Sequence, residues 1–294
     1  MEMADLKMLT AMITPYDPDL QVNYDRAGDI AEYLVDTGSD GLVVSGTTGE
    51  SPVLSHDEKL RLFSTVKGKV GSRVEIWAGT GSYDTQGSID LSREAEKVGV
   101  DGLLTVVPYY NKPSQEGLYQ HFKAIAESVS IPIMLYNIPS RSGVNMLPET
   151  VARLAEIENI VALKESTGDM NQLSVLKNIV PESLAIYSGD DALTLPMLAL
   201  GAVGVVSIAS HLVGKDIKRM LAAFTTGDVA QAQLIHNYLF PIFKGLFITT
   251  NPIPVKEALN LLGKDVGGFR LPLCNAKKEE VEQLKEMLGQ YNLL

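Results

Sequence analysis

The chain has 294 residues, 45% hydrophobic and 21% charged, a composition typical of one large globular domain or at most two small ones. Its formal net charge of −11 argues against a nucleic-acid partner, and Cys274 as the single cysteine excludes a disulfide framework and indicates a reducing, cytoplasmic setting. The N-terminus has no basic region followed by an apolar run, so we expect neither secretion nor a membrane anchor.

Eight short runs rich in Val, Ile and Leu recur along the chain, at residues 9–13, 41–45, 74–79, 102–107, 132–137, 160–164, 184–189 and 203–209. They are continuous rather than alternating, which predicts parallel strands covered on both faces. Amphipathic stretches separate them; Asn23, Ser55 and Ser114 stand where helices should begin, and Gly38 and Gly99 where helices should end. Eight strands with seven right-handed crossovers predict a closed (βα)₈ barrel of the α/β class. An open doubly wound sheet is the alternative, but no GxGxxG follows the first run.

The uncharged stretch 193–210 is about as long as a membrane span, so it needs a separate interpretation. Pro196, Gly201 and Gly204 divide it, which favours a buried helix followed by a buried strand. Four further segments are typical of helices, at 215–227, 229–247, 254–263 and 276–291, more than the last barrel layer needs. We therefore expect a barrel with the active site over 1–225 and a C-terminal helical extension packed on it over 226–294.

Active sites of such barrels lie where the strands end, and Lys164 ends the run 160–164. Two-residue alternation places Lys164 on the same face as Ala162 and Ile160, toward the barrel interior. A desolvated ammonium is disfavoured there, and the neutral amine can attack a carbonyl carbon to form an imine. Taken alone, Lys164 fits a strand-end lysine that reaches solvent, but the polar residues after the other runs favour the imine.

Hydroxyl groups and one arginine follow the neighbouring runs. Tyr136 ends the preceding run, where its phenol can carry protons, and Thr47 and Tyr110 can relay protons to water. Thr48 lies in a glycine-flanked turn that can hold a carboxylate, and Arg141 offers a planar fork for another. Their ordinary alternatives are packed aromatics, a turn threonine and a surface arginine. The four histidines have no metal-ligand spacing, so we assign none to catalysis or to a metal.

Six segments carry a resemblance to a known family: GTTGE at 46–50, YYNKPSQEGLYQHF at 109–122, YNIPSRSG at 136–143, LKES at 163–166, YSGDDA at 187–192 and NPIPVK at 251–256. Together they resemble the 4-hydroxy-tetrahydrodipicolinate synthase (dihydrodipicolinate synthase) family, within the N-acetylneuraminate lyase superfamily of class I aldolases. The resemblance implies condensation of pyruvate with L-aspartate 4-semialdehyde to 4-hydroxy-tetrahydrodipicolinate in lysine and diaminopimelate biosynthesis. It also implies that neither metal nor organic cofactor is needed, and that the chain forms a homotetramer, with a dimer left open.

The resemblance further implies roles for the catalytic residues. Lys164 matches the Schiff-base lysine and Tyr136 the general acid and base. Thr47 and Tyr110 match the rest of a proton relay, in which the tyrosine comes from a neighbouring subunit. Thr48 would bind pyruvate.

Val206 likewise matches a pyruvate-binding position, and Arg141 matches the residue that holds the carboxylate of the second substrate. One alternative is a sister aldolase, such as N-acetylneuraminate lyase or a 2-keto-3-deoxy-sugar-acid aldolase. The lyase pattern has GSTGE in place of GTTGE and lacks the arginine after YNIP. The other alternative is a noncatalytic barrel that senses pyruvate or lysine, since a fold alone does not fix a function.

The lysine-inhibition cleft of this family departs from its pattern here. Lys59, Tyr83 and Gly87 stand at positions that sensitive members fill with a histidine, an asparagine and a glutamate. The residues that remain compatible with the cleft are Ser51, His56 and Tyr109. Losing a carboxylate and gaining an ammonium repels a cationic amino acid. We therefore expect feedback inhibition by lysine to be weak or absent.

Overall fold

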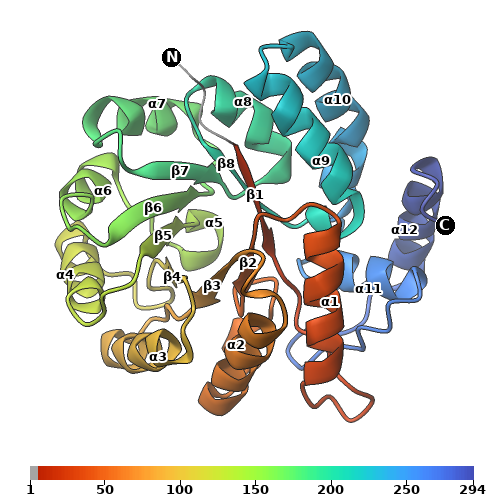
Figure 1. Cartoon of the computed structure of the whole chain (residues 1–294), viewed down its shortest axis with the longest axis horizontal. Coiled ribbons are helices and arrows are strands. Elements are labelled where there is room, and N and C mark those ends of the chain that lie inside the picture. Colours follow the sequence, from red (N-terminus) through yellow and green to blue (C-terminus); the bar gives the residue numbers. More distant parts are fainter. Residues whose placement is uncertain (1–5) are drawn as a thin grey trace.

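The computed structural model describes residues 6–294, in which eight parallel strands close into a barrel in chain order (Figure 1). The strands are β1 (Lys7–Ala11), β2 (Gly41–Val44), β3 (Glu75–Gly79), β4 (Gly102–Val106), β5 (Ile133–Asn137), β6 (Ile160–Glu165), β7 (Ala185–Ser188) and β8 (Gly204–Ser207). β8 returns to pair with β1, with Thr10 opposite Ser207. The closed barrel is confirmed, and the open sheet is wrong.

Helices surround the strands and continue beyond the last of them (Figure 1). They are α1 (Tyr24–Asp36), α2 (His56–Val70), α3 (Thr85–Val98), α4 (Gln115–Ala126), α5 (Pro139–Ser142), α6 (Pro148–Leu154), α7 (Met170–Ile179), α8 (Thr194–Ala199), α9 (Ser210–Thr225), α10 (Val229–Gly245), α11 (Ile253–Leu261) and α12 (Lys278–Gln290), with 3₁₀ turns η1 (Ser51–Val53) and η2 (Asp191–Leu193). Asn23, Ser55 and Ser114 each accept a hydrogen bond from the first turn of the following helix. Gly99 ends α3 and Gly38 follows the cap of α1, so these boundary predictions are confirmed.

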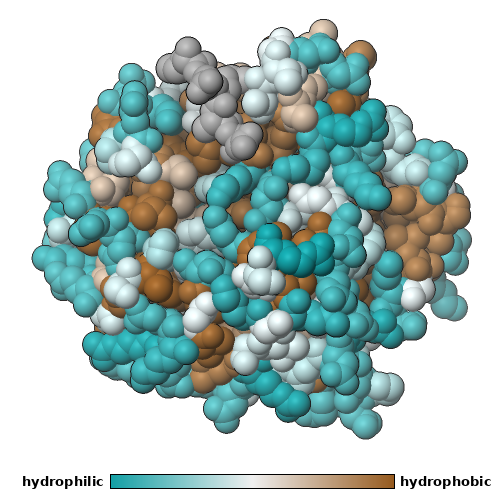
Figure 2. Space-filling view, in the orientation of Figure 1, coloured by the Kyte–Doolittle hydropathy of each residue, from teal (hydrophilic) through white to brown (hydrophobic). Residues whose placement is uncertain are grey.

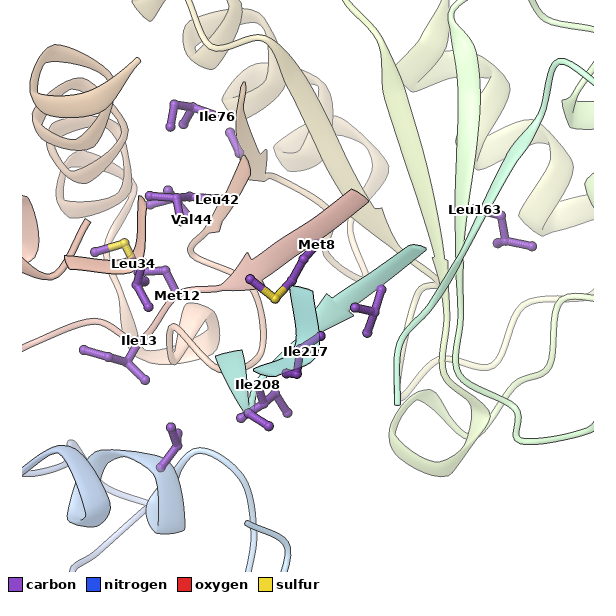
Figure 3. Packing of buried hydrophobic residues seen from close by; sticks show 14 of the residues in the cluster. Met8, Met12, Ile13, Leu34, Leu42, Val44, Ile76, Leu163, Ile208 and Ile217 are labelled. Atoms are coloured by element: carbon purple, nitrogen blue, oxygen red, sulfur yellow. The ribbon is translucent and has the colours of Figure 1, made fainter. Parts of the chain in front are cut away.

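Two hydrophobic clusters result from the alternation of side chains along each strand. Residues that face outward, such as Met8, Leu42 and Val44, pack with Leu34 of α1 in the cluster between strands and helices (Figure 3). Residues that face inward fill the barrel: Leu9, Ala11, Val43, Trp77, Leu104, Met134, Tyr136, Ala162, Tyr187 and Val206. The strands look continuously apolar in the sequence because both faces are buried.

The inner face of β6 differs in one respect from the expectation. Ala162 faces the barrel interior, but Ile160 belongs to the outer cluster, so the prediction that Ile160 shares the face of Lys164 is wrong. The register between β5 and β6 shifts here, with Ile133 opposite Ile160 and Met134 opposite Ala162. One extra residue on β6 breaks the two-residue period below Ala162.

The stretch 193–210 forms α8 and β8, as expected of a buried helix followed by a buried strand. In residues 6–294 no helix is both long and apolar enough to cross a membrane. α10 packs on α9, and α12 packs on α11 and α10, at the side of the barrel seen at right in Figure 1. The division of the chain at residue 225 stays a prediction.

Candidate active site

Lys164 lies inside the barrel near the C-terminal end of β6, beside Tyr136 of β5. The two residues are directly opposite in the register of the strands. The Lys164 Nζ atom lies 4.2 Å from the centroid of the Tyr136 ring, and the lysine is only 5% exposed. Ala162 lies below it on the same strand face and leaves room for its side chain. The amine therefore does not reach solvent as a surface lysine would.

Gly189, directly after β7, lies against Lys164 on the side away from Tyr136. Its N–H donates to the carbonyl oxygen of Glu165 over 2.9 Å, which brings the backbone of the β7 end close to β6. A Cβ atom at position 189 would lie 2.9 Å from Lys164 Cε and would overlap Ser166 Oγ. Only glycine therefore leaves the lysine its present position.

A cavity of about 210 Å³ opens at the same end of the barrel. Its polar lining includes Tyr136, Thr47, Arg141 and Tyr109, and apolar side chains such as Leu104 complete the wall. Pockets for drug-sized ligands begin at about 300 Å³, so this cavity suits a smaller molecule. The combination of a few polar groups with an apolar wall is typical of a small-molecule site.

The loop at residues 46–50 brings its two threonines to different places. Thr47 lines the cavity, whereas Thr48 is 2% exposed and its Oγ1 accepts a hydrogen bond from Asn251 Nδ2 over 3.0 Å. The loop ends at Glu50, which has the left-handed backbone conformation (φ 56°) and donates its N–H to the carbonyl oxygen of Thr47. The loop is therefore a tight turn held against the segment that contains Asn251.

Arg141 lies in the short helix α5, just beyond β5. Its Nη2 donates to the carbonyl oxygen of Asn251 over 3.3 Å, and no carboxylate pairs with it within residues 6–294. The Arg141 side chain lines the cavity of about 210 Å³ and also a second cavity of about 590 Å³, whose lining includes Ser166 and Asp190. An uncompensated guanidinium between two cavities is well placed to bind a carboxylate.

Val206 and Tyr110 complete the set of predicted site residues. Val206 of β8 is 1% exposed and packs in the inner cluster with Tyr136. Tyr110 is 90% exposed and its φ of 73° is left-handed, so it does not join its own barrel's cavity. Tyr109 lines that cavity instead, in edge contact with Tyr83 at 5.3 Å between ring centroids, and burial raises the pKa of Tyr109.

Two buried carboxylates, Glu165 and Glu50, lie next to the site residues. Glu165, next to Lys164 but on the other strand face, accepts from Asn137 Nδ2 (3.2 Å) and from the N–H of Thr167 (2.6 Å), and burial raises the pKa of Glu165. Burial also raises the pKa of Glu50 and lowers that of its partner Lys256, while their mutual attraction opposes both shifts.

Sequence analysis assigned no role to Glu50, Lys256 or Asn251. The segment NPIPVK at 251–256 was the available signal, but spacing alone could not show what it contacts. One of the histidines, His211, is held in the core: its Nδ1 is 2.8 Å from the carbonyl oxygen of Ile208, its Nε2 accepts from the N–H of Ile13, and burial lowers its pKa to about 4.

Comparisons with known proteins agree with this geometry. A model of the dihydrodipicolinate synthetase family matches residues 5–291. The 4-hydroxy-tetrahydrodipicolinate synthase of Desulforamulus reducens is 59% identical over 289 residues, 98% of each chain. The structure of dihydrodipicolinate synthase from Aquifex aeolicus has a TM-score of 0.96 and 46% identity over 98% of both chains. That of DHDPS from Cyanidioschyzon merolae with lysine bound has a TM-score of 0.97 and 44% identity over 99% of both chains.

Proposed function

The chain belongs to the dihydrodipicolinate synthetase family, and from this we infer that it condenses pyruvate with L-aspartate 4-semialdehyde to give 4-hydroxy-tetrahydrodipicolinate. The observation that carries the assignment of its nucleophile is the buried amine of Lys164, 4.2 Å from the Tyr136 ring at the mouth of the barrel. The relatives reported for comparison are named as synthases of this kind, which favours the synthase activity over the activity of a sister aldolase.

The chemistry uses the amine of Lys164 as nucleophile and the phenol of Tyr136 as proton carrier. The amine attacks the keto carbon of pyruvate, and loss of water gives a protonated imine. The imine draws electrons from the methyl group, which loses a proton to give an enamine, and the enamine carbon attacks the aldehyde carbon. The amino group of the second substrate then displaces Lys164 from the imine carbon and closes the ring. Tyr136 can supply and accept the protons because its ring lies beside the amine.

The two substrate carboxylates need separate partners. We assign pyruvate's carboxylate to the turn at Thr48, with Val206 as the packing surface beneath, and the second substrate's carboxylate to Arg141. Thr47, in the same loop, belongs to the proton relay with Tyr110. The guanidinium of Arg141 lies between the two cavities and has no carboxylate partner among residues 6–294, which supports this assignment. No step requires a metal or an organic cofactor, and we place the reaction in the cytoplasm, where amino-acid precursors are made.

Tyr110 leads us to propose that the active site is completed by a neighbouring subunit in a homotetramer. Its side chain is 90% exposed and does not reach its own cavity. Hydrophobic side chains are also exposed on the C-terminal part of the chain, among them Leu234 (65%) and Leu271 (81%). Figure 2 shows brown patches of hydrophobic residues on a mostly hydrophilic face of the molecule. Burial of these side chains against another subunit would remove apolar surface from water, which favours association.

Mixing two inactive variants tests the neighbour's contribution. Subunits with Lys164→Ala lack the nucleophile, and subunits with Tyr110→Phe lack the relay hydroxyl. In a mixed pair one site has both groups, so random pairing restores roughly a quarter of the wild-type rate. Recovery no higher than the sum of the separate variants would show that Tyr110 acts within its own chain.

Borohydride trapping tests the proposed mechanism. With pyruvate present, reduction of the imine adds a pyruvate-derived mass to the peptide that contains Lys164, and Lys164→Ala abolishes the adduct. The assay with aspartate semialdehyde, run with a metal chelator, should proceed at full rate, and sialic acid should not be cleaved. An adduct on another lysine, or none, would refute the mechanism; faster sialate cleavage would favour the sister aldolase.

A further inference from the structure

Lys256 and Glu50 form an ion pair that is completely enclosed by protein. Nζ of Lys256 lies 2.7 Å from Glu50 Oε1, and the side chains of both residues have 0% exposure. The ammonium also donates to the carbonyl oxygen of Gly268 over 2.6 Å. The rings of Tyr16 and Phe269 lie 4.3 and 4.8 Å away from it. The ammonium is thus surrounded by groups that stabilise a cation.

The pair joins the far end of the chain to the loop beside the cavity. Glu50 is the last residue of that loop, 206 positions before Lys256 of α11. Its left-handed φ of 56° is unfavourable for a residue with a side chain, and its N–H reaches back to the carbonyl oxygen of Thr47. Whatever fixes the Glu50 carboxylate therefore also fixes the turn that presents Thr47.

The segment that precedes Lys256 contacts the site at two more points. Asn251 donates its Nδ2 to Thr48 Oγ1 over 3.0 Å, and its carbonyl oxygen accepts from Arg141. Residues 251–256 therefore contact the loop at Thr48 and at Glu50, and contact the proposed carboxylate-binding arginine as well. The C-terminal part of the chain is thereby attached to both carboxylate sites.

Stability alone does not explain a pair of this kind. Removing two charges from water costs about as much as their attraction returns, and well-packed neutral groups of the same shape are often equally stable. What an enclosed, hydrogen-bonded pair adds is one defined geometry. Resting on the function proposed above, we propose that the Lys256–Glu50 pair is a positioning device for the reaction, which holds residues 46–50 in the conformation that binds pyruvate.

The test compares the neutral double variant Glu50→Gln/Lys256→Met with a matched control. In the control, Asp40→Asn/Lys218→Met, the removed pair (2.7 Å) joins α9 to the residue before β2, at the other end of the barrel from the cavity. The readout is the pyruvate concentration that gives half-maximal borohydride trapping at Lys164, with folding followed by circular dichroism.

We expect the site double variant to fold and to need at least about tenfold more pyruvate than the wild type, as for the loss of a charged hydrogen bond, while the control stays within about twofold. A folded site double variant with wild-type pyruvate dependence would overturn the inference. So would its failure to fold, since the pair would then be a stability element, or an equal shift in the control. Absence of trapping in the wild type would instead sink the proposed function, on which the inference rests.

Discussion

Replacing Gly189 with alanine tests whether the position of Lys164 is set by the wall opposite it. The added Cβ would overlap Ser166 Oγ, which must rotate away, and would lie 2.9 Å from Lys164 Cε and 3.2 Å from its Cγ. Carbon atoms in ordinary contact lie about 3.5–4.0 Å apart, so the lysine must move by roughly 0.5–1 Å. Gly189 is not among the glycines with positive φ in residues 6–294, so alanine adds crowding without backbone strain.

The size of the effect follows from this displacement. A misplacement of about 1 Å in a reacting group costs on the order of 10²-fold in rate. Overpacking of a filled interior costs about 1–3 kcal/mol of unfolding free energy, which lowers the melting temperature by several degrees but leaves the protein folded. We therefore expect Gly189→Ala to lose about 10²-fold in kcat/KM while it remains folded at 25 °C.

The assay combines steady-state rates with the rate of borohydride trapping at saturating pyruvate. Both should fall together, because both depend on the amine reaching the keto carbon. Gly28→Ala, in α1 away from the site, is the matched control, since its Cβ meets Lys69 Cγ at an ordinary 3.5 Å, with no positive φ. If Gly189→Ala keeps kcat/KM within about twofold of the wild type, the crowding argument is refuted.

Substituting Arg141 with lysine keeps the charge but removes the planar fork. The KM for aspartate semialdehyde should therefore rise about 10-fold or more, while borohydride trapping of pyruvate stays unchanged. A change in trapping without a change in this KM would contradict the assignment. L-Lysine should not half-inhibit the enzyme below the millimolar range, because Gly87 replaces the carboxylate that would attract its ammonium group and Lys59, whose pKa burial lowers, offers no negative charge instead. Initial rates against lysine concentration check this. The hydrogen bond from Arg270 lowers the pKa of Glu58 in the folded protein. The stabilisation of the fold by ionised Glu58 is therefore complete above the ordinary glutamate pKa and is lost as pH falls through the lowered pKa. Urea unfolding should therefore find Glu58→Gln about 1 kcal/mol less stable at pH 7 and equal to the wild type at strongly acidic pH.

The barrel could be predicted because eight runs of the right length alternate with amphipathic stretches. Which side chains face inward was harder, because residues on both faces of a parallel strand are apolar. Counting by twos from Lys164 succeeded at Ala162 and failed at Ile160, where β6 has one residue more than β5 requires. Such a register shift depends on pairing with a neighbouring strand and leaves no mark in the sequence of either one.

The centre of the site was predictable for a similar reason. Lys164 and Tyr136 lie next to the last residues of consecutive strands, and consecutive strands of a barrel are neighbours, so their contact follows from the topology. The contact of Lys256 with Glu50 does not follow, because one residue lies on a helix of the C-terminal part and the other in a loop 206 positions earlier. A lysine in an amphipathic stretch normally indicates an exposed helix face, whereas this one is enclosed.

The adjacent Tyr109 and Tyr110 show why backbone conformation decides what a motif does. In the sequence the two are equivalent, yet only Tyr109 lines the cavity, while Tyr110 has a φ of 73° and 90% exposure. The left-handed backbone conformation of a tyrosine costs on the order of 1 kcal/mol or more. Because the Tyr110 ring is exposed, no burial of apolar surface offsets this cost. Burial of the ring against a neighbouring subunit would offset this cost. The same contact would place Tyr110 at the active-site cavity of that neighbouring subunit.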